Sequence, residues 1–285
     1  MAVADEPTGK LKIVIMNTYG NTLDASICNK VEKRRQVISD VVKKSGATLF
    51  LFQEFMWTGI SGSVWEDKLP SHLEYIGNGN TCILFDENKV TVEEVPDKTG
   101  MQSSTLERMC IGKVKTKGVP IVEFICISWH GKSRETNEIR IEELKSMLKD
   151  ISKLSNKLSL PVLLAGDFNL NAGDIVKQLS LISSLRLFLY GYKPAKRRKS
   201  ENIIDFFISS ESLKMSGIKV LALESITEVA EVLSLFDHDP VVSFMSTKPE
   251  NKDSLTSYMM SNLSISTLTS DTDTTSSEIS AEVED

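Results

Sequence analysis

The stretch Pro161–Leu170, PVLLAGDFNL, passes directly from a short apolar segment into polar side chains. Residues Val162 to Ala165 have the length and composition of a buried strand. Asp167 and Asn169 follow at once, and neither side chain suits a hydrophobic core. Taken alone, an Asp or Asn at a strand end is most often a turn former. The stretch becomes informative because the same form recurs along the chain.

Polar residues also end or interrupt other apolar segments that lie far apart in the sequence. They are Asn17 after LKIVIM, Gln53 and Glu54 after TLFLF, His130 after IVEFICISW, Asp205 within IIDFFI, and Asp237 and His238 just before an apolar run. The strand ends of a packed sheet converge on one rim, where loops leave room for a ligand. Carboxylates, carboxamides and imidazoles together are the groups that a hard divalent cation and phosphoryl transfer require. The pattern therefore predicts a metal-assisted site at one rim.

The rest of the chain alternates between strand and helix signals. Helical spacing of apolar residues predicts one helix around residues 31–42 and a second over Glu135–Leu154. Strands are expected at Leu11–Met16, Thr48–Phe52, Cys82–Phe85, Val90–Val95, Met109–Lys115, Val119–Ser128, Val162–Ala165, Ile203–Ile208, Ile218–Leu223 and Val241–Met245. Consecutive strands indicate antiparallel hairpins, and other strands alternate with helices, so we expect mixed sheets.

Composition places the chain among globular proteins and separates a tail from the body. Of the 285 residues 41% are hydrophobic, and no apolar run approaches the roughly 18 residues of a membrane span. Residues 1–10 are expected to be flexible and do not resemble a secretory signal. Residues 247–285 are rich in Ser, Thr and acids, which predicts a disordered tail that carries the net charge of −6. Four cysteines without a CxxC pair favour a reducing compartment, so we expect an intracellular, cytoplasmic or nuclear monomer.

Six segments together resemble a known family. In chain order IMNTYGN, LFQE, SWHG, GDFN, IIDFF and FDHDP are similar to the motifs of the endonuclease/exonuclease/phosphatase superfamily, which includes deoxyribonuclease I. The resemblance covers residues 11 to about 245. It implies an α/β fold, a four-layer sandwich of two packed mixed β-sheets flanked by helices. It also implies a phosphodiesterase that depends on Mg²⁺, with Mn²⁺ as an alternative ion.

The resemblance assigns roles to the polar residues one by one. Glu54 would be the principal magnesium ligand, helped by Asn17 and Asp237. Asp167 would orient or deprotonate the attacking water, and Asn169 would hold the scissile phosphate. These roles agree with the physical requirement that phosphodiester hydrolysis neutralises charge and aligns a water molecule.

Two histidines complete the set that the resemblance implies. His238, paired with Asp205, would serve as a base or as a clamp on a phosphate oxygen. His130 resembles the leaving-group histidine of the deoxyribonuclease branch. Whether Asp167 or His238 is the general base stays open. Many abasic-site relatives carry an acid at the position of Tyr19, so the metal ligands here would be fewer.

Two stretches suggest how a substrate could be bound. The run KPAKRRK includes Lys196, Arg197 and Arg198 beside tyrosines, a combination that could follow a phosphate backbone and stack on bases. A solvated basic loop is the alternative interpretation. Trp57 follows Glu54 in a glycine-containing segment, where it could belong to a recognition loop or to the core.

Nucleic acid is the substrate that the sequence favours. The IDFF form is closer to nucleases and deadenylase-like members of the family than to its inositol-polyphosphate phosphatases. Two alternatives stay open: a phosphatase or phosphodiesterase for a small or lipid phosphoester, and a catalytically silent binding module with the same fold.

Overall fold

The structure is a computed structural model that describes residues 10–18, 28–55, 68–77, 80–95, 101, 106–118, 120–182, 185–192 and 203–246. Trp57 and the basic residues Lys196, Arg197 and Arg198, which we expected to bind substrate, lie outside these ranges. The expected tail over 247–285 and the first nine residues also lie outside them. No helix within the described ranges is long and apolar enough to cross a membrane.

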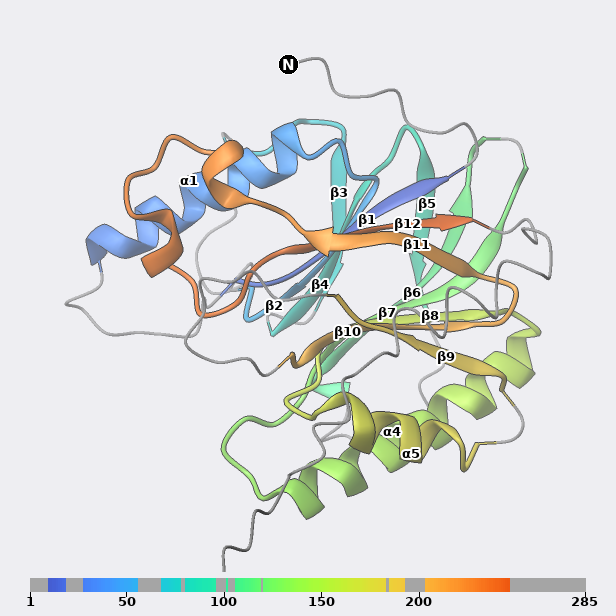
Figure 1. The fold of residues 1–285 in the computed structure, drawn as a ribbon. Helices are drawn as coiled ribbons and strands as arrows, with labels where there is room; N and C mark the ends of the chain where they lie inside the picture. Colours follow the sequence, from blue (N-terminus) through green and yellow to red (C-terminus); the bar gives the residue numbers. More distant parts are fainter. Residues whose placement is uncertain are drawn as a thin grey trace, which may run out of the picture. The chain divides into compact units, whose positions relative to one another are not determined.

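Two six-stranded mixed sheets pack face to face (Figure 1). Sheet A has the order β11-β12-β1-β2-β4-β3, with β11 at Lys214–Val220, β12 at Val241–Ser246, β1 at Leu11–Asn17, β2 at Leu49–Gln53, β4 at Thr81–Asp86 and β3 at Leu73–Gly77. Sheet B has the order β5-β6-β7-β8-β10-β9, with β5 at Val90–Glu94, β6 at Met109–Thr116, β7 at Glu123–His130, β8 at Val162–Asp167, β10 at Asp205–Ser210 and β9 at Leu187–Tyr190.

The alternation of side chains along each central strand supplies two hydrophobic layers. In β1, Ile13 and Ile15 pack between the sheets, whereas Val14 and Met16 pack on the outer face of sheet A. Because both faces of such a strand are buried, its sequence is a continuous apolar run and not an alternating one. This explains why the central strands could be read directly from the sequence.

Helices cover the outer face of each sheet. Helix α1, Cys28–Lys44, packs its apolar face on sheet A, and helices α4, Asn137–Leu158, and α5, Ala172–Leu179, pack on sheet B (Figure 1). Two short 3-10 helices, η2 at Leu223–Ser225 and η3 at Val232–Ser234, lie between β11 and β12. The result is the expected four-layer α/β sandwich.

Several expected boundaries were wrong. The strand expected at Val119–Ser128 runs over Glu123–His130, the strand expected at Ile218–Leu223 runs over Lys214–Val220, and α4 ends four residues later than expected. Strands β3 and β9 and helix α5 were missed because they are short and only partly buried. Strands β4 and β5 do not form the expected hairpin, because the three residues between them turn the chain from sheet A into sheet B.

The sheet topology gathers the polar strand ends at one rim. β1 and β2 run parallel and end together in sheet A, and β7 and β8 do the same in sheet B. The hydrogen bond from Asn17 to Asp167 shows that the two pairs end on the same side. β10 runs antiparallel to β8, with Asp205 opposite Asp167, and β12 runs antiparallel to β1. The start of β10 and the loop before β12 therefore reach the same rim.

Candidate active site

The polar residues at this rim point inward between the two sheets. Asn17 lies on the same face of β1 as Ile13 and Ile15, which pack between the sheets. Asp167 lies on the same face of β8 as the inward Leu163 and Ala165. The same rule places His130 and Asp205 on the inward side of their strands. Strand period and parallel pairing thus bring together residues that are more than one hundred positions apart in the sequence.

Asn17 links the two sheets at the centre of the site. Its Nδ2 donates to Glu54 Oε1 at 3.3 Å and to Asp167 Oδ2 at 3.1 Å. Asn17 is only 2% exposed, so the two carboxylates that it bridges meet in a protected environment. One amide group therefore sets the relative positions of a sheet A acid and a sheet B acid.

Glu54 sits in a left-handed backbone conformation, with φ at 53°. Such a conformation is unfavourable for a residue with a side chain and persists where neighbouring contacts impose it. Thr18 supplies those contacts. Its N–H donates to Gln53 O at 2.8 Å, and its hydroxyl lies 3.0 Å from both Gln53 O and Glu54 O. The turn directs the Glu54 carboxylate back toward Asn17.

The GDFN segment forms a tight turn around the Asp167 carboxylate. The backbone N–H of Asn169 donates to Asp167 Oδ1 at 2.9 Å, and Asn169 also has a left-handed backbone, with φ at 50°. Asn169 Nδ2 donates to Gly131 O at 3.1 Å, and the Asp167 carbonyl accepts from Gly131 N–H at 2.7 Å. A side chain on Gly131 would collide with Phe168 O, so the close approach of these two loops requires glycine.

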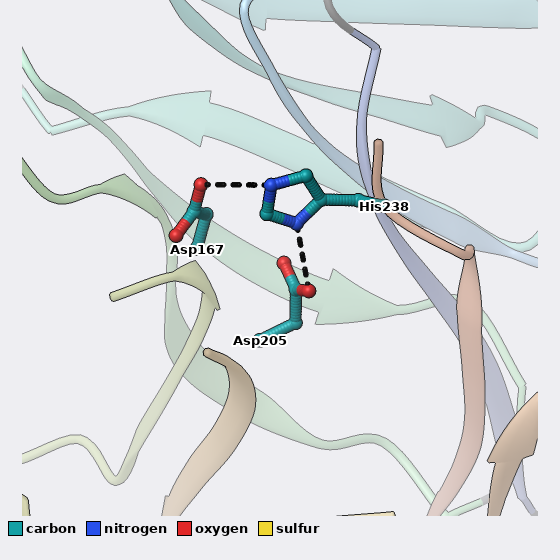
Figure 2. Close-up of side chains that lie close together, drawn as sticks. All are labelled: Asp167, Asp205 and His238. Carbon is teal, nitrogen blue, oxygen red and sulfur yellow. Dashed lines mark hydrogen bonds and ion pairs between the residues drawn. The ribbon is translucent and has the colours of Figure 1, made fainter. Parts of the chain in front are cut away.

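His238 lies between two buried carboxylates (Figure 2). Its Nδ1 is 2.9 Å from Asp205 Oδ2, and its Nε2 is 3.6 Å from Asp167 Oδ2. Burial alone would lower the pKa of His238, but Asp205, Asp167 and Asp237 raise it to about 10. His238 is therefore an imidazolium at neutral pH, with both ring nitrogens protonated.

The same surroundings also raise the pKa of Asp167. Burial and the neighbouring Asp205 carboxylate raise the pKa of Asp167 to about 7, although His238, Asn17 and the Asn169 N–H each lower it in part. A carboxyl group with a pKa close to ambient pH is suited to accept a proton in a reaction. The pair thus consists of a poised carboxylate and a charged imidazole.

His130 approaches the site from the other side of Glu54. Its Nε2 is 3.5 Å from Glu54 Oε1, and its Nδ1 is 3.0 Å from Asn80 Oδ1. Burial, Arg108 and His238 lower the pKa of His130 to about 4. The ring is therefore neutral at pH 7, and its contact with Glu54 is a polar contact and not an ion pair.

The donor chemistry of the site fits a divalent cation such as Mg²⁺. Four carboxyl groups meet here, those of Glu54, Asp167, Asp205 and Asp237. Among the described residues, His238 is the one cation that contacts these acids. Carboxylate and carboxamide oxygens are the ligands that Mg²⁺ prefers. The surplus of negative charge would be relieved by such an ion.

Asp167, Asp205 and His238 lie close enough to ligate one ion, since their ligand atoms are within 4.8 Å of one another. An imidazolium has no lone pair to offer a metal, however, and Nδ1 is already engaged with Asp205. These three residues therefore fit a hydrogen-bonded relay better than a metal centre. Glu54 and Asn17 remain the better oxygen ligands.

The loop that carries His238 is anchored on helix α1. Arg34 Nε donates to Leu235 O at 2.7 Å, and Thr227 Oγ1 donates to Asp40 Oδ2 at 2.5 Å. Arg34 and Asp40 are both buried, so these contacts are shielded from water. Helix α1 thereby fixes the position of a histidine some two hundred residues away.

The structure brings together most of the predicted site and adds residues to it. Asn17, Glu54, His130, Asp167, Asn169, Asp205 and His238 are joined by the contacts above. Asp237 is at the edge, with a side chain that is 54% exposed and 3.9 Å from His238 Nε2. Sequence reasoning missed the roles of Thr18, Asn80 and Tyr192, whose hydroxyl lies 3.5 Å from Asp205. All three carry a polar group within one or two residues of the end of a strand that reaches this rim, and this position could have identified them in the sequence.

Solved structures share this fold. An endonuclease/exonuclease/phosphatase family protein from Bacteroides thetaiotaomicron aligns with a TM-score of 0.65 at 20% identity, over 85% of this chain and 99% of the other. A mannosyl-6-phosphatase from the same organism aligns with a TM-score of 0.62 at 20% identity, over 82% and 99%. TDP2 of D. rerio, complexed with single strand DNA product, aligns with a TM-score of 0.55 at 15% identity, over 84% and 99%.

No protein-family model matches the sequence, and no curated protein matches it. The structural likenesses establish that this chain has the deoxyribonuclease I-like fold of the endonuclease/exonuclease/phosphatase proteins. The prediction of the fold from six short motifs is therefore confirmed. Because one fold hosts many activities, the reaction must be argued from the side chains at the rim.

Proposed function

We propose that the protein is a divalent-cation-dependent phosphodiesterase that cleaves nucleic acid. The proposal rests on one observation above all: Asn17 and Glu54 from sheet A meet Asp167 from sheet B through a single amide group, next to the His238–Asp205 pair. This combination offers oxygen ligands, a carboxylate poised near neutral pH and a fixed positive charge within hydrogen-bonding range of one another.

Glu54 and Asn17, with Asp237 at the edge, would hold Mg²⁺ or Mn²⁺. The ion would supply Lewis-acid neutralisation of the phosphate charge. The buried contacts of Asn17 and the Thr18 hydroxyl would keep the Glu54 carboxylate in place when no substrate is present.

Asp167 would accept the proton of the attacking water. Its raised pKa supports this role, and three hydrogen-bonding or charged neighbours, Asn17, Asn169 and His238, fix its orientation. His238 is protonated at neutral pH, so it would clamp a phosphate oxygen and stabilise developing charge instead of acting as the base.

Asn169 and His130 would complete the contacts to the phosphate. The Asn169 carboxamide has two N–H donors, and one of them is given to Gly131 O, which leaves the second for a phosphate oxygen. His130 is neutral, so it would assist the leaving group by donating a hydrogen bond and not as a strong acid.

The decisive experiment is a substrate panel. Plasmid, single-stranded DNA, RNA and bis(p-nitrophenyl) phosphate are incubated with the protein in Mg²⁺, Mn²⁺ or EDTA, with Asp167→Asn protein purified in parallel to reveal contaminating nuclease. We expect cleavage of nucleic acid only with metal and only by the wild type. Binding of nucleic acid without cleavage of any substrate would instead identify a silent binding module.

A second candidate is a phosphatase of small phosphorylated molecules. The likeness to a mannosyl-6-phosphatase favours it, because the rim chemistry of a monoester and a diester hydrolase can be the same. Turnover of sugar phosphates or of a lipid phosphoester, with nucleic acids left intact, would support this candidate over the nuclease.

A further inference from the structure

A pair of cations, Arg108 and Lys132, flanks the end of β7. Arg108 immediately precedes β6, and Lys132 follows His130 by two residues. Arg108 Nη1 donates to His130 O at 3.1 Å, and the His130 N–H donates back to Arg108 O at 2.9 Å. The Arg108 side chain is therefore tied to the backbone of a residue that faces Glu54, and Lys132 lies two residues further along the chain.

One acid on helix α4, Glu143, lies within 4 Å of both cations. Glu143 Oε1 is 3.9 Å from Arg108 Nε and 3.8 Å from Lys132 Nζ, and the Glu143 side chain is only 7% exposed. Both distances exceed hydrogen-bonding range, and Glu143 Oε1 has no hydrogen-bond partner. Burial raises the pKa of Glu143 although both cations lower it in part, which is consistent with loose pairing.

The cations therefore keep donors for another acceptor. The Arg108 and Lys132 side chains are 28% and 29% exposed, so a ligand in solution can reach them. A guanidinium has five N–H donors, and Arg108 gives one of them to a described residue, at His130 O. The two cations share one close acid, Glu143, and a second acid, Glu135, is near enough to raise the pKa of Glu143. Two positive charges thus lie beside a site whose own acids are in excess.

We propose that Arg108 and Lys132 form a second anion subsite, which binds a phosphate group of the substrate next to the one that is cleaved. This inference rests on the proposed phosphodiesterase function and narrows its substrate class. The substrate carries at least two phosphates, as a polynucleotide does along each strand. A monophosphorylated sugar or a lipid with one phosphodiester would leave the subsite without a partner.

Equilibrium binding tests the subsite without relying on turnover. A short fluorescein-labelled single-stranded oligonucleotide is titrated with protein in EDTA, and anisotropy is measured over a series of salt concentrations. Arg108→Gln and Lys132→Gln should each weaken binding about tenfold. Each should also make the slope of log K against log salt shallower by about 0.7. The matched control is Lys149→Gln, which removes an exposed lysine six positions beyond Glu143 on α4 and should bind like the wild type.

A variant that binds the oligonucleotide more tightly than the wild type provides a further test, because misfolding cannot raise the affinity. Glu143→Gln keeps the shape of the side chain and removes the charge that partly neutralises both cations, so we expect tighter binding of the oligonucleotide. Weaker binding by this variant would overturn the proposal, as would wild-type affinity in both cation variants or failure of the wild type to bind at low salt.

Turnover separates this proposal from the proposed function. For the Lys132→Gln variant, kcat/KM should fall at least about fivefold more for the oligonucleotide than for bis(p-nitrophenyl) phosphate, which has one phosphate. An equal fall for both substrates would mean that Lys132 positions His130 and binds no second phosphate. Absence of any metal-dependent turnover in the wild type would refute the phosphodiesterase itself, whatever the binding data show.

Discussion

Replacement of Asp205 by Asn tests whether a buried ion pair holds His238 as an imidazolium. The His238 Nδ1 lies 2.9 Å from Asp205 Oδ2, and Asp205 is 4% exposed. Asparagine preserves the volume and can still accept the hydrogen bond, but it carries no charge. The variant removes the strongest of the effects that raise the pKa of His238 and leaves burial, which lowers it. We expect the pKa of His238 to fall, because burial is then opposed only by the more distant Asp167 and Asp237.

The effect on stability depends on pH in a definite direction. A histidine whose pKa is raised on folding stabilises the native state fully below its ordinary pKa of 6.5, and this stabilisation is lost as the pH rises through about 10. Breaking a buried pair costs about 3–5 kcal/mol, but loss of Asp205 also relieves the repulsion that raises the pKa of Asp167. We therefore expect the free energy of unfolding to fall by about 2–3 kcal/mol near pH 6 and by less near pH 10.

The assay is an NMR titration of the imidazole rings in EDTA. The chain has three histidines, so single substitutions assign each signal. The wild-type His238 ring should stay protonated to about pH 9, the Asp205→Asn ring should lose its proton at a lower pH, and the His130 ring should be neutral from about pH 5 upward. Urea unfolding of both proteins near pH 6 and pH 10 measures the stability difference. Identical His238 titrations in the two proteins would refute the ion-pair account.

Four further substitutions test other parts of the site. Glu54→Gln should weaken Mn²⁺ binding, followed by electron paramagnetic resonance, by at least about tenfold with little change in thermal stability; unchanged affinity would remove Glu54 from the metal site. Thr18→Val should also weaken Mn²⁺ binding, because the left-handed turn at Glu54 loses its hydroxyl contact, whereas Thr18→Ser should restore it; equal behaviour of the two variants would count against the role of the hydroxyl. Asn169→Gly, which tolerates the positive φ, should lower kcat by about 100-fold with the fold intact, and wild-type kcat would exclude a phosphate contact. Gly166→Ala should destabilise the protein by about 3 kcal/mol in thermal unfolding, because a Cβ there would lie 2.1 Å from Trp129 O; full stability would mean that the backbone can yield.

The sequence by itself predicted the fold and most of the polar residues that meet at the rim. The central strands could be read from their apolar runs, because burial on both faces leaves no polar alternation to confuse the signal. Asn17, Glu54, His130, Asp167, Asp205 and His238 stood out because polar residues at strand ends interrupt those runs. Periodicity also explains why Asn17, His130, Asp167 and Asp205 point inward, since each lies on the same face of its strand as residues packed between the sheets. Glu54 and His238 lie outside the strands, and their loops direct them to the site.

Only the tertiary structure decided the charge state and supporting contacts of these groups. The sequence left the general base open between Asp167 and His238. In the folded protein burial and Asp205 raise the pKa of Asp167 to about 7, and three carboxylates raise that of His238 to about 10 in spite of burial, which favours Asp167 as the proton acceptor. The left-handed turn at Glu54, its support by Thr18 and the shared acid between Arg108 and Lys132 depend on distances across the sheets and from a helix to a loop. Local sequence signals carry no information on such distances, because burial and electrostatic coupling arise only when remote segments pack together.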